Sequence, residues 1–360
     1  MIDKKTTEKI RSQAGYMEQK GRLSNEALEY IYDKGLFKLF VPAEIGGSIK
    51  PLPEALKIFE AAAHVDGSFG WVVQIGSGAG FFATTIKPDQ VRKYFSVRDF
   101  YIAGSEKANG TARKTDDGYM INGTWRFCSG ADHASLFTAS CIIESNDTEN
   151  GSLYAFAFTP DQVTVEADWN AFGLKATSSH TIHVKDALVP TKRRFDVSDP
   201  HFHFDHPVYH YPFTPFAVAN IAATVMGVAS HFFEAARNHI ESKKARWSKN
   251  GSNHYAHTKK ILAENEADFL KSRANFYEKI ESSWNNHSKG IPLTSKEMET
   301  VFYQSKIVVH FAVTGAQTLI RYLGMDVVMA DHPLNRIYRD LHTASQHGLL
   351  VDTEGEVNKF

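Results

Sequence analysis

Apolar residues in the first hundred positions recur at the spacing of an α-helix. Pro42 and the adjacent Gly46 and Gly47 interrupt this pattern, as helix-breaking residues do between helices. The apolar stripes comprise Leu28, Ile31, Leu36 and Phe37 in one segment and Ala55, Leu56, Phe59 and Ala62 in the next. The pattern predicts an N-terminal helical domain over residues 1–100.

The pattern changes twice further along the chain. Segments 154–158 and 181–184 have an alternating residue pattern, and Asp-Gly, Asn-Gly and Pro turns separate such segments. Both features are typical of β-strands. After residue 212, long helical patterns return at positions 218–238, 257–284 and 295–329. We therefore expect an α+β fold, with a central small β domain over residues 101–211 and a C-terminal helical bundle over residues 212–360.

Composition limits the classes of partner. The chain has 360 residues, enough for two or three domains. Its formal net charge is -1 and its isoelectric point is about 7.0, so no charge footprint for nucleic acid or a membrane surface is present. Hydrophobic residues make up 42% of the chain, without an unbroken apolar stretch long enough to span a bilayer. We expect a soluble protein with neither nucleic acid nor membrane as a partner.

Cysteine content and the first residues bear on the cellular compartment. Cys128 and Cys141 are the two cysteines, too few for a disulfide framework, which fits a reducing compartment. The first ten residues are charged and lack the apolar core of a signal peptide. We expect cytoplasmic localisation.

Segment 123–130 carries the first candidate chemistry. Trp125 and Phe127 offer flat apolar faces, while the Ser129 hydroxyl and exposed backbone amides such as that of Gly130 offer hydrogen bonds to the edge of a planar heteroaromatic ring. A flavin has such a ring. Aromatic residues that alternate along a strand also occur in ordinary cores, so this motif alone leaves both interpretations open.

Four motifs, in order along nearly the whole chain, resemble the acyl-CoA dehydrogenase superfamily. They are segment 22–47, which begins Arg22-Leu23-Ser24; segment 123–130; segment 173–179, followed by a strand that ends at Val189 and Pro190; and segment 333–341, which contains Arg339-Asp340. The resemblance implies a helical domain, a small β domain and a four-helix bundle, with flavin as cofactor, either FAD or FMN. This arrangement agrees with the one predicted from periodicity.

The resemblance also implies where a catalytic base belongs. Dehydrogenases of this superfamily use a glutamate to remove the substrate's α-proton. Its usual position follows the Arg-Asp motif, immediately before a glycine, where this chain has His347 before Gly348. The alternative position, on an earlier helix ahead of Gly227, corresponds to about Ala217. Neither residue is a carboxylate, which speaks against ordinary acyl-CoA desaturation.

His347 and the Trp-x-Phe-x-Ser-Gly form of segment 123–130 are similar to the oxygenase components of two-component flavin-dependent monooxygenases, of the 4-hydroxyphenylacetate or steroid-phenol hydroxylase type. This resemblance implies that a separate reductase supplies reduced flavin and that a small substrate, aromatic in those relatives, is hydroxylated. It places Ser129 near flavin N5, where it stabilises the oxygenated flavin, and His347 beside the substrate as a base or hydrogen-bond donor. Two alternatives stay open: an acyl-CoA dehydrogenase whose base lies elsewhere, and a non-catalytic flavin-binding relative.

Further cofactor contacts are implied by the same resemblance. Thr177, Ser178 and Ser179 correspond to the place where the family's β domain meets the flavin, although Lys175 replaces an arginine and Ser178 a glycine of the family pattern. The remaining predicted contacts, made across a subunit interface, are Arg246 and the nearby Ser248, for the flavin pyrophosphate, and Gly324, in a turn between bundle helices.

Subunit contacts require an oligomer, and we expect a homotetramer, as is usual for the superfamily. Apolar residues at helical spacing offer a surface for a core or a subunit contact: Phe302, Ile307, Val308, Phe311 and Ala312.

Two further patterns are interpreted as structural. Segment 76–80, Gly-Ser-Gly-Ala-Gly, resembles a dinucleotide loop, but no strand precedes it, so close helix packing explains it better. His201, His203, His206 and His210 lie in a Pro- and aromatic-rich connection with irregular spacing, so no metal site is predicted there.

Overall fold

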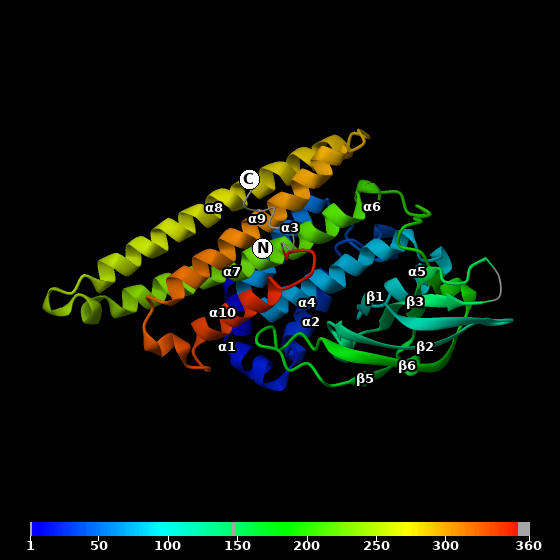
Figure 1. The fold of residues 1–360 in the computed structure, drawn as a ribbon, viewed down its shortest axis with the longest axis horizontal. Coiled ribbons are helices and arrows are strands. Elements are labelled where there is room, and N and C mark those ends of the chain that lie inside the picture. The colour runs from blue at the N-terminus through cyan, green and yellow to red at the C-terminus, as the bar shows by residue number, and fades with distance from the viewer. Residues whose placement is uncertain (1, 146–147, 352–360) are drawn as a thin grey trace.

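The computed structural model describes residues 2–145 and 148–351. Figure 1 shows an elongated molecule in which long helices run along the body and the strands gather at one end. The chain passes through helices, then one sheet, then helices again, so the predicted α+β organisation is confirmed. The domain boundaries at residues 100 and 211 stay predictions.

Five α-helices precede the sheet, and side-chain caps explain where three of them begin. Asp3 accepts a hydrogen bond from the backbone N–H of Thr6 at 2.9 Å, Ser24 caps the second helix and Asp66 caps the fourth. The predicted apolar stripes face the core, since Ile31 and Phe59 are fully buried. The helices are α1 (Lys4–Lys20), α2 (Asn25–Asp33), α3 (Leu52–Val65), α4 (Gly67–Gly78) and α5 (Pro88–Phe95).

The described strands form a seven-stranded sheet in the order β5-β6-β2-β1-β3-β4-β7. Neighbouring strands are antiparallel except β1 and β3, which are parallel. The strands predicted at 154–158 and 181–184 are confirmed within β4 and β6. The bounds are β1 (Ile102–Thr115), β2 (Gly118–Cys128), β3 (Leu136–Glu144), β4 (Leu153–Phe158), β5 (Thr164–Glu166), β6 (His180–Val189) and β7 (Arg194–Phe195).

Three long helices and two shorter ones follow the sheet: α6 (Pro207–His210), α7 (Phe213–Trp247), α8 (His254–His287), α9 (Ser295–Ile320) and α10 (Pro333–Ala344). Thr294 and Glu297 form a capping box that starts α9. The helical pattern predicted over 295–329 is too long, because α9 ends at Ile320 and the chain turns at Gly324, where φ is 85°. Short 3₁₀-helices connect the elements at Leu36–Lys38, Ala43–Ile45, Ala79–Thr84, Ala131–His133, Pro160–Gln162, Thr191–Arg193, Lys249–Gly251 and Met325–Val328.

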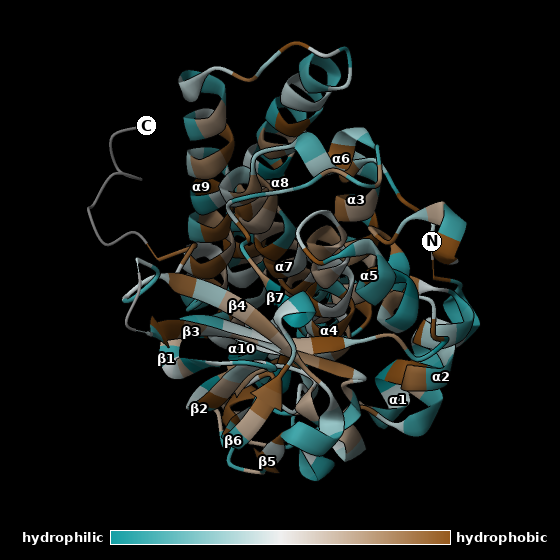
Figure 2. Cartoon of the chain, turned by 90° about the vertical axis from the view of Figure 1, so that its right-hand side faces the viewer, coloured by the Kyte–Doolittle hydropathy of each residue, from teal (hydrophilic) through white to brown (hydrophobic). Residues whose placement is uncertain are grey.

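Helix α7 is the central helix of the molecule and packs against α3, α4, α8, α9 and α10. By length and composition it could cross a membrane, contrary to the expectation that the chain has no such stretch. Within the fold, 89% of its most apolar window is buried, so the neighbouring helices cover it. Figure 2 shows that hydrophobic and hydrophilic residues alternate along α8 and α9, as in helices that bury one face.

Candidate functional site

Ser129 directly follows β2, at a β-bulge. Two residues of β2, Arg126 and Phe127, face the single residue Thr181 of β6, because the register shifts there. Phe127 has a φ of 69°, and 52% of its side chain is exposed, whereas Ser129 is only 8% exposed. The bulge thus turns one aromatic ring outward beside a nearly buried hydroxyl.

The turn after Ser129 requires a glycine. Gly130 has a φ of 75°, and a Cβ at this position would lie 2.3 Å from the Tyr101 ring. The Tyr101 hydroxyl donates to the carbonyl of Ser129 at 3.1 Å. The Gly130 N–H donates to the carbonyl of Thr177 at 2.8 Å, so the expectation that this amide is free for a ligand is wrong.

A chain of hydrogen bonds runs inward from α4 through Ser129. The indole Nε1 of Trp71 donates to Ser129 Oγ at 3.1 Å, and Ser129 Oγ lies 2.8 Å from Ser179 Oγ. Ser179 Oγ lies 2.6 Å from Thr177 Oγ1, which donates to the carbonyl of Leu174 at 2.8 Å. All five residues are buried, so this chain forms the inner wall of the site.

His347 lies just after α10 and meets the other side chains of the site at Trp71. The centroids of the two rings are 6.1 Å apart. The backbone N–H of Leu349 donates to His347 Nδ1 at 3.3 Å, which leaves the proton of the neutral ring on Nε2. Burial lowers the pKa of His347, and the nearby Glu106 opposes this shift. His347 is therefore a neutral ring with an Nε2–H that can donate to a ligand.

The structure thus brings together the two predicted catalytic residues, and it does so through a residue that sequence reasoning missed. Trp71 was part of an apolar helical segment without any motif of its own. A single large indole in the glycine-rich segment 67–78 was the one available signal.

The expectation that Trp125 provides a flat wall for a cofactor is wrong. Its side chain is fully buried, and Nε1 donates to the carbonyls of Lys107 and Ser140, each at 3.1 Å. A Cβ at Gly110 or Gly123 would lie 2.3 Å from the indole ring, so the ring is closely packed against both strands. Trp125 belongs to the core of the sheet, whereas Phe127 is exposed, with the Arg126 guanidinium 4.7 Å from the centroid of its ring.

Thr177 and Ser178 support the site from within, which corrects the expectation that they line it. Each is 1% exposed. The Ser178 hydroxyl lies 3.1 Å from the carbonyl of Gly21 and 3.0 Å from Asp132 Oδ2, so it joins the end of α1 to the turn after Ser129. Of Thr177, Ser178 and Ser179, it is Ser179 whose hydroxyl contacts the hydroxyl of Ser129.

Arg246, Ser248 and Gly324 lie together at the other end of the molecule. A Cβ at Gly324 would lie 3.7 Å from the ring of Trp247, which stacks on His254. In Figure 1 this α7–α8 connection is at the opposite end of the molecule from the sheet. Within one chain these residues are therefore remote from Ser129, and a cofactor contact by them requires a second copy. Their contacts stay predictions.

The Arg-Asp motif before His347 is structural. Asp340 accepts a hydrogen bond from the backbone N–H of Leu174 at 2.6 Å. Arg339 donates to the carbonyl of Phe172 at 3.0 Å and pairs with Glu18 of α1. The motif thus fixes α10 to the loop that carries segment 173–179, and so holds His347 and the serine chain in one place.

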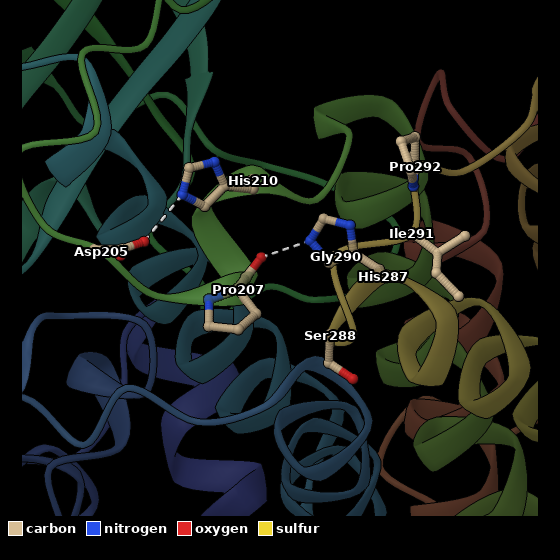
Figure 3. Close-up of a pocket in the computed structure, with 8 residues that line it drawn as sticks. All are labelled: Asp205, Pro207, His210, His287, Ser288, Gly290, Ile291 and Pro292. Carbon is tan, nitrogen blue, oxygen red and sulfur yellow. Dashed lines mark hydrogen bonds and ion pairs between the residues drawn. The ribbon is translucent and has the colours of Figure 1, made fainter.

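The two patterns interpreted as structural have defined packing roles. A Cβ at Gly76 would lie 2.5 Å from Tyr101, so this glycine permits close packing of α4. His206 caps α6, and His210 bonds to Asp205 at 3.2 Å. Figure 3 shows Asp205 and His210 on one side of a surface pocket. None of the residues that line this pocket belongs to the site around Ser129. Within residues 2–145 and 148–351, no cluster of three or more metal-ligating side chains occurs.

The chemistry of the residues around Ser129 fits a planar heteroaromatic group. The exposed Phe127 ring lies edge-to-face with Trp169 at 6.1 Å, and the indole N–H of Trp169 donates to the carbonyl of Leu174. An exposed aromatic ring, a hydroxyl with an unused lone pair and an imidazole N–H together suit a flavin with a small substrate beside it.

Comparisons with known proteins give consistent results. Residues 1–95 match the acyl-CoA dehydrogenase N-terminal domain, and residues 219–351 match the acyl-CoA dehydrogenase C-terminal domain. An indole-3-acetate monooxygenase from Pseudomonas putida is 26% identical over 348 residues, which cover 95% of this chain and 87% of the relative. The oxygenase subunit HsaA of a flavin-dependent monooxygenase from Mycobacterium tuberculosis is 30% identical over 249 residues, which cover 66% of this chain and 61% of the relative.

Solved structures show the same fold. The 3-HSA hydroxylase from Rhodococcus sp. RHA1 superposes with a TM-score of 0.88 at 22% identity, and the match covers 96% of this chain and 91% of that one. TdsC from Paenibacillus sp. A11-2, in complex with FMN and indole, superposes with a TM-score of 0.80 at 19% identity, covering 99% of this chain and 94% of that one.

Proposed function

Because the chain belongs to the acyl-CoA dehydrogenase superfamily, we propose that it is the oxygenase component of a two-component flavin-dependent monooxygenase that hydroxylates a small aromatic molecule. The observation that carries this proposal is the meeting of Ser129 and His347 at Trp71. A neutral imidazole, that of His347, stands where a dehydrogenase of this fold has its carboxylate, and the Ser129 hydroxyl lies on the other side of Trp71.

Each side chain has a distinct role in the proposed reaction. The flavin, when bound, supplies the activation of oxygen. Ser129 holds the flavin edge, and Trp71 fixes the position of the Ser129 hydroxyl. The Nε2–H of His347 donates to an oxygen or nitrogen atom of the substrate and orients its ring. The buried indole and the aromatic face of Phe127 limit the access of water.

The carboxylates of the described chain give little support to the dehydrogenase alternative. Ala217 and His347 occupy the two positions of the base. Asp340 accepts a hydrogen bond from the backbone N–H of Leu174 through one of its oxygens, and burial raises its pKa to about 8. Glu106, on an irregular part of β1, is exposed and interacts with His347 as a charge.

The names of the relatives support the remaining parts of the proposal. HsaA is an oxygenase subunit, which is consistent with delivery of reduced flavin by a separate reductase. The relatives act on indole-3-acetate or were crystallised with indole, which favours an aromatic substrate. We also propose that the protein resides in the cytoplasm.

We further propose a homotetramer, in which a neighbouring chain completes the cofactor site. Met325, Val328 and Met329, beside Gly324, are 78%, 53% and 59% exposed. Such an apolar patch suits a subunit contact. It would bring Arg246 of one copy to the cofactor of another, and a monomeric mass in solution would contradict this arrangement.

Rapid mixing of the flavin complex with oxygen tests the function. The protein is loaded anaerobically with reduced FAD or FMN and mixed with oxygen and a panel of phenols and indoles. We expect a hydroxylated product. Bleaching of oxidised bound flavin by an acyl-CoA would instead support a dehydrogenase, and failure to bind any flavin would contradict both enzymatic functions.

A further inference from the structure

The hydrogen bonds behind Ser129 have defined ends. At one end the indole N–H of Trp71 can only donate, and at the other the carbonyl of Leu174 can only accept. Between them lie three hydroxyls, those of Ser129, Ser179 and Thr177, each with one proton. The ends of the chain therefore determine its direction.

The direction follows from the accepting end. Thr177 Oγ1 donates its only proton to the carbonyl of Leu174, so it accepts a hydrogen bond from Ser179. Ser179 Oγ donates its only proton to Thr177, so it accepts a hydrogen bond from Ser129. Ser129 in turn accepts from Trp71 and donates to Ser179. One lone pair of Ser129 Oγ remains unused.

Burial keeps this arrangement in place. Ser179, Thr177 and Leu174 are 4%, 1% and 2% exposed, so water has little access to substitute for a lost partner. If any one hydroxyl donated in the opposite direction, a buried oxygen would lose its donor or two protons would point at each other. A buried polar group without a hydrogen-bond partner lowers the free energy of unfolding, so the opposite direction is disfavoured.

We propose that Ser179 and Thr177 are positioning residues that hold Ser129 as a hydrogen-bond acceptor toward the cofactor. This inference rests on the proposed function. Reduced flavin carries a proton on N5, whereas oxidised flavin presents only a lone pair there. A Ser129 oxygen that accepts but does not donate therefore favours the reduced form over the oxidised form.

Substitution of Thr177 tests this direction. In Thr177→Val the hydroxyl of Ser179 loses its acceptor and turns toward Ser129, which frees the Ser129 proton for the ligand. The carbonyl of Leu174 keeps the N–H groups of Thr177 and Trp169 as donors, so the variant leaves no orphaned acceptor. Ser179→Ala frees the same proton directly. Thr177→Ser keeps the hydroxyl and serves as the matched control.

The measurement is the ratio of the dissociation constants for oxidised and reduced flavin, each from an anaerobic titration, with thermal unfolding to show that every variant is folded. We expect Thr177→Val and Ser179→Ala each to lower this ratio about tenfold, the value of one hydrogen bond. Thr177→Ser should keep the wild-type ratio. An unchanged ratio in both disrupting variants, with flavin still bound, would overturn this inference alone. Failure of the wild type to bind either form would overturn the proposed function as well.

Discussion

The indole Nε1 of Trp71 donates a hydrogen bond of 3.1 Å to the hydroxyl of Ser129, joining the helical domain to the end of a β-strand. The same indole ring lies 6.1 Å from the imidazole of His347, which follows the last helix. Three distant parts of the chain therefore meet at one side chain, and in the proposed reaction the relative placement of cofactor edge and substrate would depend on it.

Trp71→Phe should disturb that placement while leaving the fold intact. Loss of one buried hydrogen bond lowers the free energy of unfolding by about 1 kcal/mol, because the phenyl ring fills most of the same space. We expect a larger share of the consumed oxygen to appear as hydrogen peroxide, since Ser129 loses the hydrogen bond that fixes its hydroxyl relative to His347. Peroxide yield and chemical denaturation measure the two effects, and a wild-type peroxide yield would contradict this role for Trp71.

Glu106→Gln should alter the pH dependence of hydroxylation. Burial lowers the pKa of His347, and the Glu106 carboxylate opposes that effect, so its removal lowers the pKa further. Protonation of Nδ1 breaks the bond from Leu349 and releases the ring, so hydroxylation declines below the pKa. The acid limb of the pH profile should therefore move to lower pH.

The control for this experiment is Glu144→Gln, which removes an exposed carboxylate at the end of β3. It should leave the profile unchanged. An equal shift in both variants would indicate a general charge effect, and no shift in Glu106→Gln would count against the coupling.

Asp340→Asn should flatten the pH dependence of stability. Burial and, next, the charge of Asp66 raise the pKa of Asp340 to about 8. The folded protein thus retains a proton that the unfolded chain releases, so the free energy of unfolding falls as pH rises from about 4 to about 8. Asparagine keeps the oxygen that accepts from Leu174 but cannot ionise. Thermal midpoints at both ends of this range provide the measurement, and an undiminished fall in the variant would refute the assignment.

The sequence predicted the order of helices and strands because periodicity reports which faces are apolar. The family resemblance singled out Ser129 and His347, which the structure brings to the same indole ring, and their roles stay predictions. Trp125 and Phe127 are two positions apart, and the period of a regular strand would place both on one face. The bulge at Arg126 and Phe127 separates them, and no periodicity reveals a bulge.

The role of Trp71 was not predictable for a different reason. Helix α4 is buried on nearly every side, so its sequence shows no stripe that marks a functional face. The direction of the hydrogen bonds from Trp71 to Leu174 likewise depends on contacts between segments that are 50 and 58 residues apart, which a sequence pattern does not report.

The central claim is that His347 orients a substrate for oxygenation, and the ratio of hydroxylated product to oxygen consumed tests it most directly. With reduced flavin supplied, His347→Ala should still consume oxygen, but the ratio should fall about a hundredfold, with hydrogen peroxide released instead. A wild-type ratio in this variant would contradict the account and leave His347 with a structural role at the end of α10.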